Sequence, residues 1–344
     1  MPSRAEAPAA PAREGGAPPR SRIHYLVPDY DHPSWGTAML YEHVRLLRET
    51  GFDARVVHER APFRLSWIDH DVPVAHLDAP EEPPVPGDLL VVPETLAASS
   101  AELRWPCRRV VFVQGSFLLA RGLRGARGFA ELGFESALAV LPHVARVVEN
   151  HFGLAAEVVP PFVAPYFFRS PEEIRSRPRS RTILLAAKPE YRAAGFPDYD
   201  LFRALLAPRL ERGDGWRLTE LHGLRHSEVA EVMADASFLV NLNSHEAFNS
   251  TVPEAMAAGC VPVCYDAFGG QDYLVDGVNA FVFPNHHVFP LAEKLLELLD
   301  APPEVLEPVR LGGRETAGRY TRGATREALE RAFTRLVGAA AGAG

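Results

Sequence analysis

The sequence has little cysteine, no long apolar run and no excess of positive charge. Cys107, Cys260 and Cys264 cannot all pair with one another, so a disulfide scaffold is excluded and a reducing compartment is expected. Apolar runs extend over only a few residues, as at 89–92, whereas a membrane-spanning helix needs about twenty. The chain has 44 acidic and 36 basic side chains, a net charge of −8, which argues against a nucleic-acid partner. We therefore expect a cytoplasmic protein.

Two further signals are missing. Residues 1–21 consist mostly of alanine, proline, glycine and arginine without an apolar core, so they predict a disordered tail and no secretory signal. His222 and His226 have the spacing of two metal ligands on a helix, but Gly223 argues against a helix there and no His-Glu-x-x-His motif accompanies them. We therefore predict no metal site and interpret both histidines as polar loop residues.

The chain does have the composition of a globular protein, with 47% hydrophobic residues and 344 residues in all, enough for about two domains. Short apolar runs alternate with segments of helical spacing, a pattern typical of parallel sheets covered by helices. Strands are predicted in the first half at 23–27, 55–58, 89–92, 110–113, 137–141 and 158–159. Strands are predicted in the second half at 182–187, 218–221, 238–242, 261–265 and 280–283.

A proline-rich segment at 160–178 separates these two series of strands. We predict an α/β fold with two Rossmann-like parallel-sheet lobes, residues 22–162 and 163–325, that face a central cleft. One long helical pattern is predicted at 303–337, and residues 326–344 are expected to cross back to the first lobe and end in a tail. In such sheets ligands bind at the carboxyl ends of the strands, so the cleft is the expected site.

The segment 243–259, NSHEAFNSTVPEAMAAG, holds the densest group of candidate site residues. An apolar strand is predicted to deliver Glu246, a tight loop to carry Asn249, and a helix to start near Pro253 with Glu254 in its first turn. The start of such a helix offers unpaired backbone N–H groups that suit a phosphate. Carboxylates accept hydrogen bonds from hydroxyls, so the two glutamates suit a sugar and a ribose.

Each glutamate also has a structural alternative. Thr251 and Glu254 have the spacing of a capping box, in which the glutamate bonds a backbone N–H of its own helix. Glu246 follows an apolar strand, where a solvated surface carboxylate is the alternative.

The two glutamates, with seven residues between them and followed by AMAAGCVPV, resemble the donor-binding signature of retaining GT-B glycosyltransferases, in particular glycosyltransferase family four (glycosyl transferases group 1). The run 269–284, GGQDYLVDGVNAFVFP, resembles that family's glycine-rich loop and next strand. The resemblance is dense over 225–300 and thinner in the first half. It implies a GT-B fold and transfer of a sugar from a nucleotide-sugar, with retention of configuration and without a metal or other cofactor.

The resemblance also implies roles for individual residues. Glu246 would contact the donor sugar and Glu254 the ribose, while Lys188 and Arg192 stand at or next to the positions of two cations that hold the diphosphate. We therefore predict Glu246, Lys188 and Arg192 as catalytic residues; a solvated loop is the alternative for the two cations. The predicted donor-binding residues are Glu254, Asn249, Ser250, Thr251, Gly36, Gly269 and Gly270.

The sequence departs from the family pattern Glu-Gly-Phe-Gly, which here reads Glu246-Ala247-Phe248-Asn249. Asparagine tolerates positive φ better than other residues with a side chain, so the turn can survive at Asn249. Ala247 narrows the space beside the backbone. These departures put the sugar preference in doubt more than the fold.

The first lobe is expected to bind the acceptor, a glycan, a lipid-linked molecule or a small molecule. No G-x-G-x-x-G follows the first strand, which argues against a nicotinamide enzyme. Gln114 and Ser116 are candidates to face the cleft, with a simple turn as the alternative. No general base is assigned, and His143, after a strand end, is a weak candidate. The segment 118–129, with arginines at 121, 124 and 127, suits either a peripheral membrane contact or, in preference, a solvated basic loop.

Two rival functions remain open at this point. One is a nucleotide-sugar epimerase or hydrolase on the same fold, which differs from a transferase in needing no acceptor. The other is a non-catalytic GT-B subunit that binds a nucleotide or a partner protein.

Overall fold

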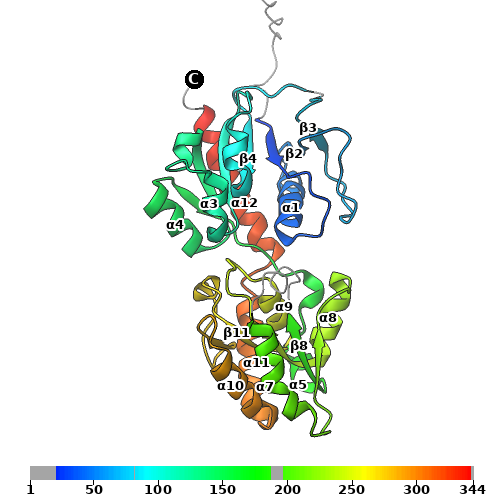
Figure 1. Cartoon of the computed structure of the whole chain (residues 1–344). Helices are drawn as coiled ribbons and strands as arrows, with labels where there is room; N and C mark the ends of the chain where they lie inside the picture. The colour runs from blue at the N-terminus through cyan, green and yellow to red at the C-terminus, as the bar shows by residue number, and fades with distance from the viewer. Residues whose placement is uncertain (1–20, 81, 187–196, 342–344) are drawn as a thin grey trace, which may run out of the picture.

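The computed structural model describes residues 21–80, 82–186 and 197–341, which form two α/β lobes stacked end to end (Figure 1). In both lobes every pair of neighbouring strands is parallel. Strands such as β4 (Leu89–Pro93) are buried along their whole length, as expected for a parallel sheet covered on both faces.

The first lobe is built on a seven-stranded sheet with the order β3-β2-β1-β4-β5-β6-β7. Its other strands are β1 (Ile23–Leu26), β2 (Ala54–His58), β3 (Val74–His76), β5 (Arg108–Val113), β6 (Phe134–Ala139) and β7 (Ala156–Val158). Its helices are α1 (Trp35–Glu49), α2 (Ala97–Ser100), α3 (Leu119–Leu123) and α4 (Pro142–Phe152), with 3-10 turns η1 (Glu94–Leu96), η2 (Ser116–Leu118) and η3 (Phe129–Leu132).

The second lobe has a five-stranded sheet with the order β12-β11-β10-β8-β9. Its strands are β8 (Ser180–Ala186), β9 (Arg217–Glu220), β10 (Ala236–Asn241), β11 (Val261–Tyr265) and β12 (Phe281–Phe283). Its helices are α5 (Pro171–Ser176), α7 (Asp198–Leu210), α8 (His226–Asp235), α9 (Thr251–Ala258), α10 (Val288–Leu299) and α11 (Pro303–Ala317), with 3-10 turns η4 (Pro165–Phe167) and η5 (Gly269–Asp272).

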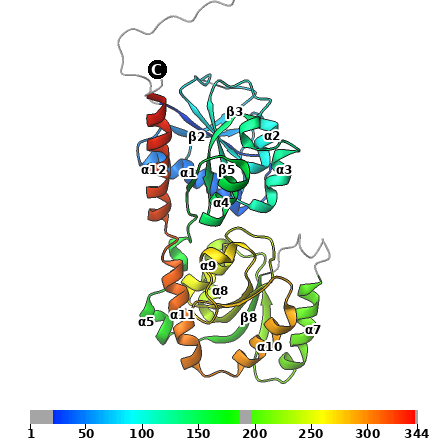
Figure 2. The ribbon, with the colours of Figure 1, turned by 90° about the vertical axis from the view of Figure 1, so that its left-hand side faces the viewer.

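The prediction of one helix over 303–337 is wrong, because α11 ends at Ala317 and α12 (Arg322–Ala341) begins after a break at 318–321. The chain crosses from the second lobe to the first within this break (Figure 2). At the start of α12 the Thr321 hydroxyl accepts a hydrogen bond from the Ala324 N–H at 3.2 Å. This crossing lies just before the boundary expected at 325/326.

Helix α12 packs on the first lobe, where it runs along one side of the sheet (Figure 2). The fully buried Phe333 lies against Tyr25 of β1 and against Phe52, with ring centroids 6.2 and 6.3 Å apart. Arg322 forms an ion pair with Glu49 at the end of α1, 2.6 Å between nitrogen and oxygen. The end of the chain thus completes the lobe that its beginning starts.

The proline-rich segment also contains a helix that was not predicted, α5. Ser170 and Glu173 form a capping box, with the Ser170 hydroxyl accepting from the Glu173 N–H at 3.2 Å and the Glu173 carboxylate accepting from the Ser170 N–H at 2.7 Å. Pro171 occupies the first turn, where its missing N–H costs nothing. The sequence signal was present, but the density of prolines favoured the interpretation as a linker.

The three cysteines are free and buried. Burial raises the pKa of each thiol to about 12, so each stays protonated at neutral pH. Among the residues that the structure describes, no helix has the length and apolar character needed to cross a membrane.

Candidate functional site

A cleft of about 1050 Å³ opens between the two lobes. It lies where loops that follow strands of both sheets meet, the place at which open α/β sheets bind ligands. The first lobe contributes the start of α1, and the second contributes the starts of α8 and α9. Lining residues from these three helix starts are Ser34, Trp35, Arg225, His226, Ser250, Thr251 and Glu254.

Glu254 lies in the first turn of α9 with its side chain only 7% exposed, at the wall of this cleft. One carboxylate oxygen lies 2.9 Å from Nε2 of His226, and Nδ1 of the same ring lies 2.6 Å from the Tyr166 hydroxyl. Burial raises the pKa of Glu254, and the facing His226 offsets part of this rise. Burial lowers the pKa of His226, but the Glu254 carboxylate outweighs it and leaves the pKa raised. The carboxylate is therefore held in place by a partner that can be cationic.

The capping-box alternative for Glu254 is wrong. Thr251 is already inside the helix, and Ser250 at the N-cap position has helical backbone angles and makes no side-chain cap. The Glu254 carboxylate instead reaches across to His226, so its partner comes from another helix, α8, and not from its own. Sequence reasoning treated His226 as a loop histidine. Because the partners are 28 positions apart in the sequence, no spacing rule could have paired them.

Asparagines build the loop between β10 and α9. Asn249 has φ +53°, which confirms that it takes the conformation expected of a glycine. Its side-chain oxygen accepts a hydrogen bond from Asn241 Nδ2 at 3.0 Å, and Asn241 Oδ1 accepts from the Asn243 N–H at 3.0 Å. The Tyr199 hydroxyl donates to Asn243 Oδ1 at 2.8 Å. This network fixes the loop that precedes Ser250, Thr251 and Glu254.

Gly269 and Gly270 are buried in η5 beside this loop. A Cβ on Gly269 would lie 1.6 Å from the backbone oxygen of Ala247, and one on Gly270 would lie 2.4 Å from Leu274. Gly269 therefore serves close backbone packing, whereas Gly270 leaves room for the Leu274 side chain. They are not among the residues that line the cleft, and neither is Asn249.

Glu246 is half-buried in the same loop, and its N–H donates to the oxygen of Ala267 at 3.3 Å. Glu246 is thereby paired with Phe268, the exposed residue just before η5, in an isolated parallel β-bridge. Glu246 therefore lies beside the glycine-rich segment but outside the set of residues that line the described cleft. The other two predicted catalytic residues, Lys188 and Arg192, lie outside the described part of the chain.

Gly36 is in the first turn of α1, next to the cleft residues Ser34 and Trp35. Its carbonyl accepts a hydrogen bond from Gln114 Nε2 at 3.2 Å, and a Cβ there would lie 2.4 Å from Gln114 Oε1. Ser116 begins the turn η2 and is half-buried. Glycine at 36 therefore allows Gln114 to support the start of α1.

Glu94 is a buried carboxyl group beneath this turn that sequence reasoning missed. It accepts a hydrogen bond from the Gly115 N–H at 2.9 Å and is 1% exposed. Burial raises its pKa to about 7, although backbone N–H groups lower it in part. Gly122 of α3 packs so closely on Glu94 that a Cβ at position 122 would lie 1.9 Å from the backbone oxygen of Glu94.

The basic segment at 118–129 does not form a long amphipathic helix. Helix α3 has five residues and ends at Leu123, and the next residue, Arg124, has φ +47°. The three arginines of this segment, Arg121, Arg124 and Arg127, are exposed. The preferred interpretation as a basic loop fits this geometry.

The structure also shows where the predicted histidines His222 and His143 lie. His222 lies in the loop before α8, 3.8 Å from Glu220, and Gly223 beside it has φ +71°, so no helix joins His222 to His226. Within the described ranges, no cluster of three or more histidine, cysteine, aspartate or glutamate side chains is arranged to hold a metal ion. His143 lies in the first turn of α4, where its Nδ1 is 2.6 Å from Asp272 of the second lobe.

Comparisons with known proteins found a family model, a curated relative and solved structures that are similar to this chain. Residues 216–313, which include the α8 and α9 starts, match the family model described as glycosyl transferases group 1. A curated relative, GDP-mannose:cellobiosyl-diphosphopolyprenol alpha-mannosyltransferase of Komagataeibacter xylinus, is 25% identical over 118 residues. That match covers 34% of this chain and 30% of the relative, so the chain matches less than a third of the relative's length.

Solved structures share the whole fold. Sucrose-phosphate synthase from Thermosynechococcus elongatus superposes with a TM-score of 0.69 and 14% identity, covering 93% of this chain and all of that one. HepE of Anabaena, solved with UDP, gives a TM-score of 0.66 and 13% identity over 91% of this chain and 100% of that one. The two-lobed expectation is confirmed: the chain has the GT-B fold, and its second lobe carries a segment of the glycosyl transferases group 1 type.

Proposed function

We propose that the protein is a glycosyltransferase that moves a sugar from a nucleotide-sugar to an acceptor hydroxyl with retention of configuration. The observation that carries this proposal is Glu254, a buried carboxylate in the first turn of α9, aimed at the interlobe cleft and held there by His226. It lies within the segment that matches the glycosyl transferases group 1 model.

Glu254 fits the role of a ribose ligand. A carboxylate has two oxygens and can accept hydrogen bonds from both vicinal hydroxyls of a ribose. A protonated His226 donates one N–H to Glu254 and the other to the Tyr166 hydroxyl oxygen, so it fixes the carboxylate and keeps it ionised. An ionised acceptor makes stronger hydrogen bonds than a neutral one.

The leaving diphosphate would lie close to the start of α9. Ser250 and Thr251 line the cleft there, and the N–H groups of a first helical turn stabilise developing negative charge. The resemblance assigns Lys188 and Arg192 to the same diphosphate and Glu246 to the donor sugar. Retention requires the acceptor hydroxyl to approach on the face from which the diphosphate leaves. The acceptor itself is proposed to bind on the side of the first lobe.

The comparisons suggest two donor bases for the test. HepE was solved with UDP and with UDP-glucose, whereas the curated relative is named for GDP-mannose. We would record thermal unfolding with UDP, GDP, dTDP and ADP for the wild type and for Glu254→Ala. A ligand at about 100 times its dissociation constant adds roughly 2.7 kcal/mol to the free energy of unfolding. We expect one nucleotide to stabilise the wild type and to lose most of this effect in Glu254→Ala.

The control is Glu304→Ala, because Glu304 is an exposed glutamate in the first turn of α11 and matches Glu254 in charge and helix position. We expect its nucleotide shift to equal that of the wild type. A shift of wild-type size in Glu254→Ala would remove the ribose role, and no shift with any nucleotide in the wild type would favour a non-catalytic subunit.

Product analysis separates transfer from the rival reactions. With the nucleotide-sugar that binds, a transferase consumes donor in proportion to added acceptor, whereas an epimerase or hydrolase turns over without one. The proposal includes independence from metal ions, so excess EDTA should leave the rate within error of the untreated enzyme. Loss of activity with EDTA and recovery with a divalent cation would contradict that part of it.

A further inference from the structure

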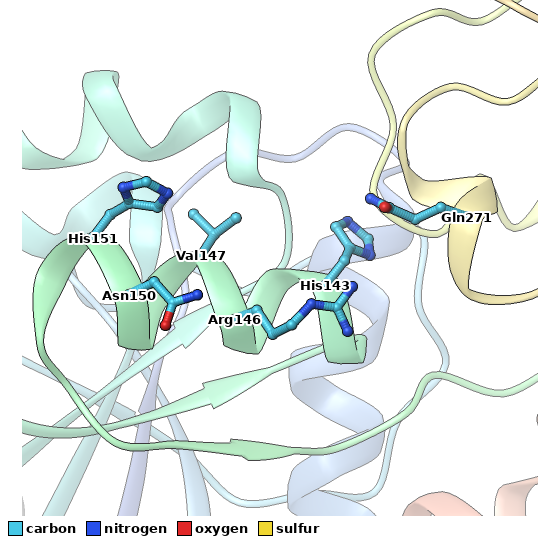
Figure 3. Close-up of a pocket in the computed structure, with 6 residues that line it drawn as sticks. All are labelled: His143, Arg146, Val147, Asn150, His151 and Gln271. Carbon is cyan, nitrogen blue, oxygen red and sulfur yellow. The ribbon is translucent and has the colours of Figure 1, made fainter.

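A second, smaller pocket lies at the outer edge of the junction between the lobes, between α4 and η5 (Figure 3). Its volume is about 220 Å³, smaller than the roughly 300 Å³ lower limit for pockets that hold a whole ligand. It has room for about seven waters at roughly 30 Å³ each, hence for one functional group of a larger molecule. It is lined by His143, Arg146, Val147, Asn150, His151 and Gln271.

The orientation of His143 is fixed by Asp272 of the opposite lobe. Asp272 Oδ2 accepts a hydrogen bond from the His143 backbone N–H at 3.0 Å and lies 2.6 Å from its Nδ1. Its other oxygen lies 3.8 Å from the guanidinium of Arg146. Because a carboxylate can only accept, Nδ1 carries the proton toward Asp272, and Nε2 is the nitrogen left for a different partner.

Nε2 of His143 is a buried polar atom without a hydrogen-bond partner among the described residues. The residue is only 6% exposed, and such atoms are normally paired because leaving one unpaired costs about 1–3 kcal/mol. Since His143 lines the pocket, the missing partner is expected there.

The other polar side chains of the pocket are nitrogen-bearing. Arg146 and Asn150 extend from the same helix as His143, and Gln271 faces them from the second lobe (Figure 3). The guanidinium and both amides donate hydrogen bonds, and among the described residues no carboxylate lines the pocket, although Asp272 lies 3.8 Å from Arg146 outside the lining. Several donors with positive charge and one small volume match a phosphate group, which has strong acceptor oxygens in a compact shape.

We propose that this pocket binds a phosphate group carried by the acceptor. The inference rests on the proposed glycosyl transfer for the identity of the ligand as an acceptor, but not for the binding of phosphate itself. Because His143 and Arg146 come from the first lobe and Gln271 from the second, a phosphate held here would also bridge the lobes. A phosphorylated acceptor would thereby favour the closed arrangement in which the reaction is expected.

The test is a titration of the full chain with inorganic phosphate and with a hexose 6-phosphate, followed by NMR of ¹⁵N-labelled histidine at constant ionic strength. We expect both probes to shift the Nε2 resonance of His143, and the unphosphorylated hexose to leave it unchanged. Arg146→Ala should weaken phosphate binding about tenfold or more, because it removes a charge-assisted hydrogen bond.

Arg104→Ala is the matched control, since Arg104 is an exposed arginine of the same lobe outside the pocket. Gln271→Ala tests the second lobe without touching the His143–Asp272 contact. Equal phosphate affinity in Arg146→Ala and Arg104→Ala, or no movement of the His143 resonance, would overturn the proposal. Binding of inorganic phosphate without the hexose phosphate would overturn the assignment to the acceptor. The nucleotide shift that depends on Glu254 is measured separately, so its failure would leave the phosphate result readable.

Discussion

At the scale of single residues, Glu94 sets a pH dependence of stability. Its pKa is about 7 in the folded protein because the carboxyl is buried, compared with about 4.5 when unfolded. A group with a raised pKa stabilises the fold below its unfolded pKa, and this contribution is lost as pH rises through the folded value. Urea unfolding should therefore show a loss of up to about 3 kcal/mol between pH 4.5 and 7 from this group.

Glu94→Gln removes the titration but keeps an oxygen that can accept from the Gly115 N–H. We expect the variant to gain stability relative to the wild type as pH rises across this window. A difference that stays constant from pH 4.5 to 8 would show that Glu94 does not bind its extra proton in the folded state.

Asn249 gives a second residue-scale prediction. Asn249 has φ +53°, a backbone conformation that destabilises alanine by about 1–2 kcal/mol. The substitution Asn249→Ala also removes the hydrogen bond from Asn241. We expect Asn249→Ala to lower the free energy of unfolding by about 2–3 kcal/mol. Asn249→Gly should recover the backbone part and lose only the hydrogen bond. Equal losses in the two variants would mean that backbone strain is not what the asparagine relieves.

Residue-scale prediction from the sequence succeeded where the cause was local. The positive φ at Asn249 follows from the chemistry of asparagine itself. The partners of Glu254 and His143 come from distant parts of the chain, His226 and Asp272, and only the fold brings them together. Whether a histidine is solvated or paired is set by those tertiary contacts.

At the scale of elements, the packing of η5 on the loop at 246–248 depends on the absence of a side chain at Gly269. Gly269→Ala would place a Cβ against the backbone oxygen of Ala247, which cannot move aside as a flexible side chain can. We expect a loss of about 1–3 kcal/mol or more in urea unfolding. Gly87→Ala is the control, since its nearest neighbour there is a hydroxyl 3.9 Å away. Similar stabilities for both variants would contradict the close packing.

Elements were predicted well where burial makes a strand uniformly apolar, as in β4 and β11, whose bounds differ from the expected ones by one residue at most. The edge strand β3 is half-buried and three residues long, so it carries no apolar run to detect. Helices α11 and α12 were merged because helical spacing continues on both sides of 318–321. The break reflects the path of the chain between lobes, which spacing does not encode.

At the scale of the whole molecule, the first lobe depends on α12. Phe333 is fully buried between this helix and the sheet, so Phe333→Ala should lower the free energy of unfolding of that lobe by about 3–5 kcal/mol. Arg335→Ala on the same helix removes an exposed ion pair with Glu157 and should cost less than about 1 kcal/mol. Hydrogen exchange in β1 and β5 would report the difference. Protection in β1 unchanged by Phe333→Ala would mean that α12 is dispensable.

Because α12 packs on the first lobe, the second lobe is completed before the first during synthesis. Domains generally fold as units in the order in which they emerge from the ribosome. Here the second lobe is one continuous stretch of chain, whereas the first is made of two pieces, the opening half of the sequence and its last helix. The lobe translated first therefore keeps an uncovered apolar surface until α12 has been translated. A nascent chain halted before Arg322 would carry a complete second lobe and an incomplete first lobe, the form on which we expect chaperones to act.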